Sequence, residues 1–170
     1  EERFRHAHSR LQEQFSDADV LAEAACHKAR LENDSGDLAS AIRTLQEFIG
    51  AGQSAVHDLM GALLGRAGHL GDAIVHARKA VATQPESAAY RFNLAALLSR
   101  RTDPEELAEA RSLAARLVRQ NPHDHASWHC LGLVQAKTDR RQDAEESLRR
   151  AVDLYPEGIR YRISLADYLV

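Results

Sequence analysis

Alanine and leucine recur along the whole chain in segments, and glycine and proline fall between these alanine- and leucine-rich segments. Ala and Leu lose little free energy on entering a helix, so this composition favours helices. Glycine permits the tight turns that end a helix, and proline prevents a helix from continuing. The pattern therefore predicts an all-α chain of paired helices. The expected breaks are Gly36-Asp37, Gly68-His69 and Gly71-Asp72 within pairs, and Pro85, Pro122 and Pro156 between them.

The chain resembles itself at regular intervals. Residues 90–98 match residues 161–169 at Tyr, Arg, Leu, Ala and Leu, a separation of 71 residues. Residues 72–81 resemble residues 143–152 at the same separation, and Pro122 lies 34 residues before Pro156. A separation of 71 exceeds two periods of 34 by three residues, which we assign to Thr102-Asp103-Pro104 in a turn between two helices. The sequence therefore predicts a repeat of about 34 residues with two helices in each unit.

Residues 125–158 carry the most specific pattern. Trp128, Leu131-Gly132, Ala144, Leu148, Ala151 and Pro156 stand at the spacing of the tetratricopeptide repeat (TPR), so the chain resembles that superfamily. The resemblance implies an α-solenoid of stacked antiparallel helix-turn-helix repeats forming a right-handed superhelix. We expect one array over residues 1–170: the second helix of a partial repeat at 1–21, repeats at 22–53, 54–87, 88–124 (with the three-residue insertion) and 125–158, and the first helix of a partial repeat at 159–170.

Small residues recur at aligned positions, where two helices can approach closely and larger side chains can pack. In the first helices these positions hold Ala29, Gly61, Ala95, Gly132 and Ala166. In the second helices they hold Ala7, Ala41, Ala73, Ala110 and Ala144. The expected large partners are Leu31, Leu64, Leu94, Leu98, Leu131, Leu148, Leu165 and Trp128.

Composition and charge argue against several classes of partner and location. The net charge is -3, so no overall positive field favours a nucleic-acid partner. No uncharged stretch is long enough for a membrane-spanning helix. Cys26 and Cys130 lie about three repeats apart, so we expect no disulfide between them. We expect a soluble protein of the cytoplasm or bacterial periplasm, and the arginine and alanine bias weakly suggests a bacterial source.

Histidine is the one candidate for metal chemistry. His123, His125 and His129 lie close to Cys130, a spacing that can bind zinc, but we favour surface or groove histidines because no Cys-pair or zincin pattern accompanies them. We find no phosphate-binding Gly-rich loop and no nucleophile elbow. The expectation is therefore a protein that is not an enzyme, with no metal and no cofactor.

The resemblance implies that certain positions of each first helix line a concave groove. Arg66, Arg100 and Lys137 share one of these positions and could form a basic row for acidic groups, or could offset helix dipoles, which we favour. One subset of the family binds the tail carboxylates of chaperones through a definite set of Lys, Asn and Arg residues. That set is not reproduced, because its Asn and Lys positions here hold Cys26, Asp58 and Ala62. The candidate partner-binding residues are Arg30, Asn33, Asp58, Arg66, Phe92, Arg100, His129 and Lys137.

These features lead to a non-catalytic protein-interaction scaffold, excerpted from a longer repeat protein and binding a protein or peptide in its groove. One alternative is a regulatory or assembly segment of a larger bacterial protein, such as a periplasmic polysaccharide-export scaffold or a TPR extension of an enzyme. Another is self-association through the terminal half-repeats.

Overall fold

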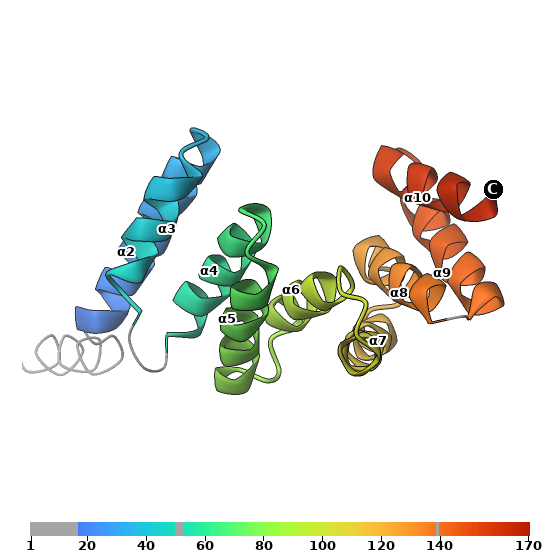
Figure 1. The fold of residues 1–170 in the computed structure, drawn as a ribbon, viewed down its shortest axis with the longest axis horizontal. Helices are drawn as coiled ribbons and strands as arrows, with labels where there is room; N and C mark the ends of the chain where they lie inside the picture. Colours follow the sequence, from blue (N-terminus) through green and yellow to red (C-terminus); the bar gives the residue numbers. More distant parts are fainter. Residues whose placement is uncertain (1–16, 50–52, 139) are drawn as a thin grey trace, which may run out of the picture. The chain divides into compact units, whose positions relative to one another are not determined.

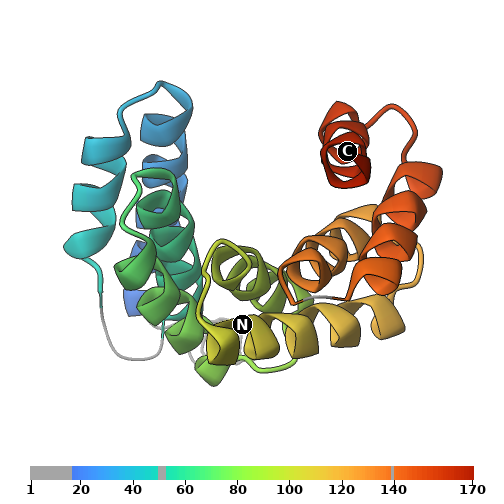
Figure 2. The same ribbon diagram turned by 45° about the vertical axis from the view of Figure 1, so that its right-hand side comes forward.

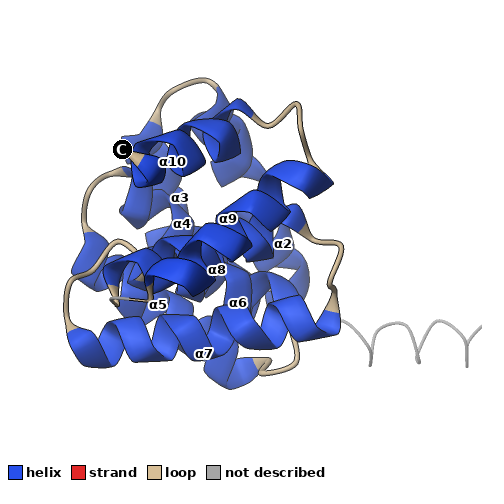
Figure 3. Cartoon of the chain, turned by 90° about the vertical axis from the view of Figure 1, so that its right-hand side faces the viewer, coloured by secondary structure: helices blue, strands red, loops and turns tan. Residues whose placement is uncertain are grey.

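The computed structural model describes residues 17–49, 53–138 and 140–170. Over these ranges it contains nine helices joined by short loops, and no strand (Figure 3). The predicted all-α class is confirmed. The helices group into two compact units, which divide between Gln84 and Pro85. No helix within the described ranges is both long and apolar enough to cross a membrane.

The first unit contains two helical hairpins (Figure 1). Helix α2 pairs with α3 and α4 pairs with α5, and α4 also packs against both α2 and α3. Helix α2 begins before position 22, so the predicted boundary after residue 21 falls inside this helix. The predicted partial repeat at 1–21 otherwise lies mostly outside the described residues. The helices are α2 (Asp17–Asp34), α3 (Leu38–Gln46), α4 (Ser54–Arg66) and α5 (Leu70–Thr83).

The second unit contains two hairpins and one further helix (Figure 2). Each helix packs against the next, and α8 also contacts both α6 and α10. The first helices of successive hairpins are therefore neighbours within this unit. The helices are α6 (Ala88–Leu98), α7 (Pro104–Gln120), α8 (His125–Lys137), α9 (Arg141–Leu154) and α10 (Ile159–Leu169).

The turns explain where the helices begin and end. Gly36 and Gly68 have φ angles of 90° and 88°, a left-handed conformation that favours glycine, and both lie at the predicted breaks. The prediction of a break at Gly71 is wrong, because α5 begins at Leu70 and includes it. At the inserted turn, Asp103 begins α7 by accepting hydrogen bonds from the first backbone N–H groups of that helix.

Small residues hold the hairpins together as predicted. Six of the aligned alanines are fully buried, and the two glycines are buried as well. A Cβ atom built on Gly132 would lie 2.8 Å from Cγ of Leu148, so only glycine allows α8 and α9 this approach. Ala7 lies outside the described residues, and Ala166 is exposed on α10. The buried alanines are Ala29, Ala41, Ala73, Ala95, Ala110 and Ala144.

The large partners behave less uniformly. Leu94, Leu98, Leu131 and Leu148 are buried, whereas Leu64, Leu165 and Trp128 are half-buried. The prediction that Leu31 packs inside a hairpin is wrong, because its side chain is 58% exposed. It follows buried Ala29 by two residues, which places it roughly 200° further round α2, on the side facing solvent.

Candidate functional site

The candidate residues of the first unit join its two hairpins. Nη1 of Arg66, at the end of α4, donates a hydrogen bond to Oδ1 of Asn33, at the end of α2. Asn33 donates in turn to Oδ1 of Asp34 over 3.3 Å. Arg30 is exposed, and Asp58 is half-buried. The Arg66–Asn33 bond links successive repeats, which is a structural role for two of the predicted groove residues.

Lys137 has the corresponding role in the second unit. Its Nζ donates to the backbone carbonyls of Ser99 and Arg101, over 2.6 and 3.3 Å. These carbonyls follow the last turn of α6, where unpaired oxygens carry the negative end of the helix dipole. Lys137 and Arg66 occupy the same place in their repeats, and each reaches one repeat back. Arg66 and Lys137 therefore brace neighbouring hairpins. The side chain of Arg100, at the same place in its repeat, is exposed.

Phe92 lies beside a cavity of about 280 Å³. The wall is formed by the start of α6, the end of α7 and the start of α8. Its polar members are already engaged: Asp124 accepts from the backbone N–H groups of Ala126 and Ser127, and Gln120 accepts from Arg91. The surface of the cavity that a ligand could contact is therefore mainly apolar. The lining residues are Ala88, Ala89, Phe92, Leu117, Gln120, Asn121, Asp124, Ala126 and Ser127.

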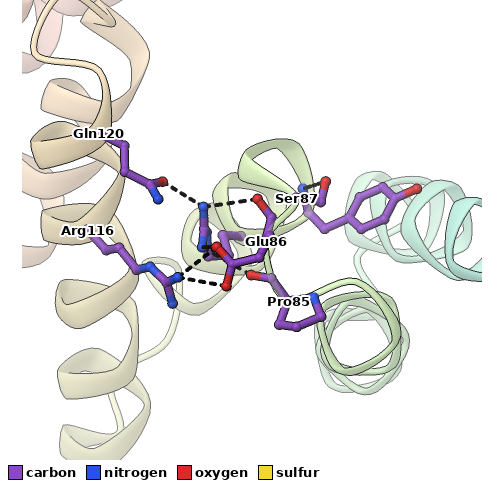
Figure 4. Close-up of polar contacts among 7 residues, drawn as sticks. Pro85, Glu86, Ser87, Arg116 and Gln120 are labelled. Carbon is purple, nitrogen blue, oxygen red and sulfur yellow. Dashed lines mark hydrogen bonds and ion pairs between the residues drawn. The ribbon is translucent and has the colours of Figure 1, made fainter.

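A buried arginine binds Gln120, one of the residues that line this cavity. Figure 4 shows Gln120 and Arg116 facing the loop of Pro85 and Glu86. Arg91 is only 1% exposed, and its guanidinium donates to the carbonyls of Pro85 (3.0 Å) and Glu86 (3.3 Å) and to Oε1 of Gln120 (2.6 Å). Arg116 adds an ion pair of 3.0 Å to Glu86. The loop before α6 is thereby tied to the last turns of α7. The sequence pattern alone did not single out Arg91, although the Tyr-Arg echo contained it.

The side chain of His129 is buried and contacts α10, so it does not face an open groove. Its side chain is 9% exposed, Nε2 lies 2.9 Å from Oγ of Ser164, and its ring lies 4.7 Å from that of Tyr161. Desolvation by burial, aided by the charge of Arg160, lowers the pKa of His129. His125 contacts the same tyrosine, with Nδ1 2.9 Å from its hydroxyl. The two histidines thus hold α10 against α8.

The histidine and cysteine side chains that were considered as metal ligands, with surface or groove histidines favoured, do not converge on one point. Both cysteines are free and buried, and burial raises the pKa of Cys130 to about 12, which disfavours the thiolate that binds metals. Within the part of the chain that the structure describes, no group of three or more His, Cys, Asp or Glu side chains could hold a metal ion. An unpredicted pair does form in the first unit, where Nδ1 of His57 lies 2.9 Å from Nδ1 of His76.

A second, larger cavity of about 560 Å³ lies between Trp128 and the outer side of α9. The indole Nε1 donates to the carbonyl of Pro122 over 2.9 Å, so its polar atom is satisfied within the chain. The α9 wall is highly charged, and Arg149 there forms an ion pair with Glu145. The remaining lining residues are Gln142, Glu146, Arg150 and Asp153.

Comparison with known proteins identifies the architecture. No protein-family model and no curated protein sequence matches the chain. MamA from Desulfovibrio magneticus RS-1 is similar in structure, with a TM-score of 0.75 and 21% identity over 90% of this chain and 84% of that one. TTC0263, a thermophilic TPR protein of Thermus thermophilus, has a TM-score of 0.70 and 20% identity over 86% of this chain and 80% of that one. A TPR protein from Parabacteroides merdae has a TM-score of 0.67 and 21% identity over 88% and 59% of the two chains.

Proposed function

Because the chain has the tetratricopeptide-repeat fold, we propose that it is a non-catalytic scaffold that binds another protein, and that the cavity beside Phe92 holds an apolar side chain of that partner. The apolar lining of this cavity is the observation that carries the proposal. Fold alone does not specify a function, so the proposal rests on the site.

The size and chemistry of the cavity suit a side chain. Its volume of about 280 Å³ lies just below the lower end of the roughly 300–1,000 Å³ range of pockets that hold drug-sized ligands. Asp124 and Gln120 of its lining already accept hydrogen bonds within the chain, so a polar ligand would gain few there. Burying one Leu or Phe side chain contributes about 1.5–3 kcal/mol. Such an anchor supports a modest affinity, which neighbouring contacts would raise.

The other predicted residues differ in their exposure, and Arg100 and Asp58 also have interactions within the chain. We propose that the exposed cations Arg30 and Arg100 contact acidic groups of a partner. Asp58, which is half-buried, would lie beside such a segment in the first unit. Asn33, Arg66, His129 and Lys137 are engaged within the chain, so their contribution is to place the hairpins.

Peptides selected from a random library for binding to the whole chain test this proposal. Ala89→Trp, at an exposed position lining the cavity, fills it without removing a core contact. Ala108→Trp makes the same change at an exposed position of α7 away from the lining. We expect Ala89→Trp to weaken the selected peptides at least about tenfold, or about 1.4 kcal/mol, and Ala108→Trp to leave them unchanged.

Two results would contradict the proposal. One is the absence of any enriched peptide. The other is equal binding of the selected peptides to both tryptophan variants, measured by fluorescence anisotropy. Circular dichroism on each variant confirms that the helices are intact before the affinities are compared.

A further inference from the structure

A pair of histidines joins the two helices of the α4–α5 hairpin. Nδ1 of His57 lies 2.9 Å from Nδ1 of His76, and the centroids of the two rings are 5.1 Å apart. His57 lies on α4, one turn before Gly61, where an added Cβ atom would lie 3.0 Å from the backbone O of Ala73 on α5. The histidine pair therefore lies beside a close approach of the two helices.

This contact depends on the protonation of the two rings. Two imidazole nitrogens at hydrogen-bond distance share one hydrogen, which one ring donates and the other accepts. A protonated imidazole has no acceptor nitrogen, so at least one ring of the pair must be neutral. When both rings bind a proton, the hydrogen bond between His57 and His76 is lost and two positive charges face each other. Protonation of both rings therefore opposes the packing of α5 against α4.

The surroundings of the pair already disfavour a charge on either ring. His57 is 7% exposed, and His76 is half-buried. Burial lowers the pKa of His57, and the positive charge of Lys79 lowers it further. The pKa of His76 is lowered by burial, by His57 and by Lys79, while the negative charge of Asp72 acts in the opposite direction. Both rings are thus held in the neutral form at neutral pH.

The charged side chains of the other helices packed against α4 act elsewhere. Helix α4 contacts α2, α3 and α5. Burial raises the pKa of Cys26 on α2, and the charges of Arg30 and Asp58 also act on this thiol. Arg43 of α3 donates a hydrogen bond within its own helix. Among the described residues, the charges that act on the histidine pair therefore come from α5 itself.

Helix α5 depends on α4 for its place in the first unit. Among the described helices of this unit, α5 packs against α4 alone. The buried residues of α5 are Ala73, Ile74, Ala77 and Ala80. A change in the contact between α4 and α5 therefore acts on α5 before it acts on any other helix of the unit.

We propose that His57 and His76 form an acid-sensitive switch that holds α5 on α4 at neutral pH and lets the hairpin open in acid. Since folding lowers the pKa of both rings, the stability that the pair contributes is complete above the unfolded value of about 6.5 and is lost as the pH falls through the folded values. The switch uses no residue that lines the Phe92 cavity, so it is independent of the proposed binding site.

A metal ion fits this pair less well than a shared hydrogen. Within the ranges that the structure describes, no third His, Cys, Asp or Glu side chain joins the two histidines as a ligand. The positive charge of Lys79, which acts on both rings, would also oppose a bound cation. Proton binding is therefore the chemistry that the geometry favours.

Hydrogen exchange of the whole chain, measured by mass spectrometry and corrected for the intrinsic effect of pH on exchange, follows the opening of α5. We expect the protection of residues 70–83 to fall at least about tenfold between about pH 7 and 5, which corresponds to one additional proton bound by the open hairpin over one pH unit. His76→Asn removes one titrating ring but retains an amide that can hydrogen-bond to His57, so the fall should be less than about threefold. His69→Gln is the matched control, because His69 is exposed and its side chain does not cap α5. It should behave like the wild type.

NMR spectra of the imidazole nitrogens provide a second measurement, which needs no variant to fold. We expect His57 and His76 of the wild-type chain to titrate below the ordinary pKa of about 6.5. Two results would overturn the proposal. One is a fall in protection that is as large in His76→Asn as in the wild type, since another group would then sense the acid. The other is titration of both rings at or above pH ~6.5, because folding would then not favour the neutral pair.

Discussion

Substitution of Gly132 by alanine tests the packing at the centre of the α8–α9 hairpin. The added Cβ atom would lie 2.8 Å from Cγ, 2.9 Å from Cδ2 and 3.2 Å from the backbone N of Leu148. These separations are shorter than ordinary carbon contacts of about 3.5–4.0 Å. Leu148 is 1% exposed, so its side chain has no open space to enter, and one of its close atoms belongs to the backbone. The two helices must therefore move apart.

Two opposing terms set the size of the effect. Replacing a helical glycine by alanine stabilises a helix by about 1 kcal/mol, because alanine has less backbone freedom to lose. Inserting a methyl group into a closely packed contact costs about 1–3 kcal/mol. Packing wins at Gly132, and we expect a net destabilisation of about 1 kcal/mol. For a chain of this length that corresponds to a decrease of about 2–4 °C in the melting temperature.

Gly71→Ala is the matched control. It makes the same substitution in a helix, but a Cβ atom there would meet nothing within 4 Å. Only the propensity term operates, so the free energy of unfolding should rise by about 0.5–1 kcal/mol. Urea unfolding followed by circular dichroism measures both variants, and fluorescence of Trp128, the single tryptophan, reports on α8 itself. A Gly132→Ala variant as stable as Gly71→Ala would refute the packing argument.

Three further predictions use the polar contacts. Arg91→Met removes the three hydrogen bonds that a buried guanidinium donates, and it should lower the free energy of unfolding by about 2–4 kcal/mol. Arg162→Met at the equivalent exposed position should change it by less than about 0.5 kcal/mol, and urea titration compares the two. Lys137→Met should cost about 1 kcal/mol in the same assay, because the carbonyls of Ser99 and Arg101 after α6 lose a charged donor; no loss would mean that water replaces it equally well. Burial lowers the pKa of His129, so below pH ~6.5 the unfolded chain binds this proton more readily than the folded chain, and stability is lost as the pH falls. His129→Asn should therefore reduce the loss in the free energy of unfolding measured between about pH 7 and 5. An unchanged slope with pH would contradict this.

Local residue chemistry was enough to predict the helices and their pairing. A helix end that needs a left-handed residue selects glycine, so Gly36 and Gly68 identified two turns correctly. Close approach of two helices selects the smallest side chains, so Gly132 and Ala144 identified positions that are buried inside a hairpin. Both requirements act between residues of a single repeat. Because the repeat recurs along the chain, the positions that meet them could be recognised in the sequence. Leu31 was assigned wrongly, because a leucine on the solvent-facing side of a helix satisfies the same pattern as one that packs inside the hairpin.

The candidate site depended on contacts between residues far apart in the sequence. Lys137 and Arg66 were interpreted as groove-lining cations that offset helix dipoles, and only the structure shows that each binds a group about one repeat earlier, at Ser99 and Asn33. The sequence pattern did not single out Arg91, which α7 and the preceding loop surround with acceptors. A charged side chain is stable inside a protein only where several partners converge on it. Residue type and spacing determine which elements form, whereas only their packing decides which polar side chains remain available to another molecule.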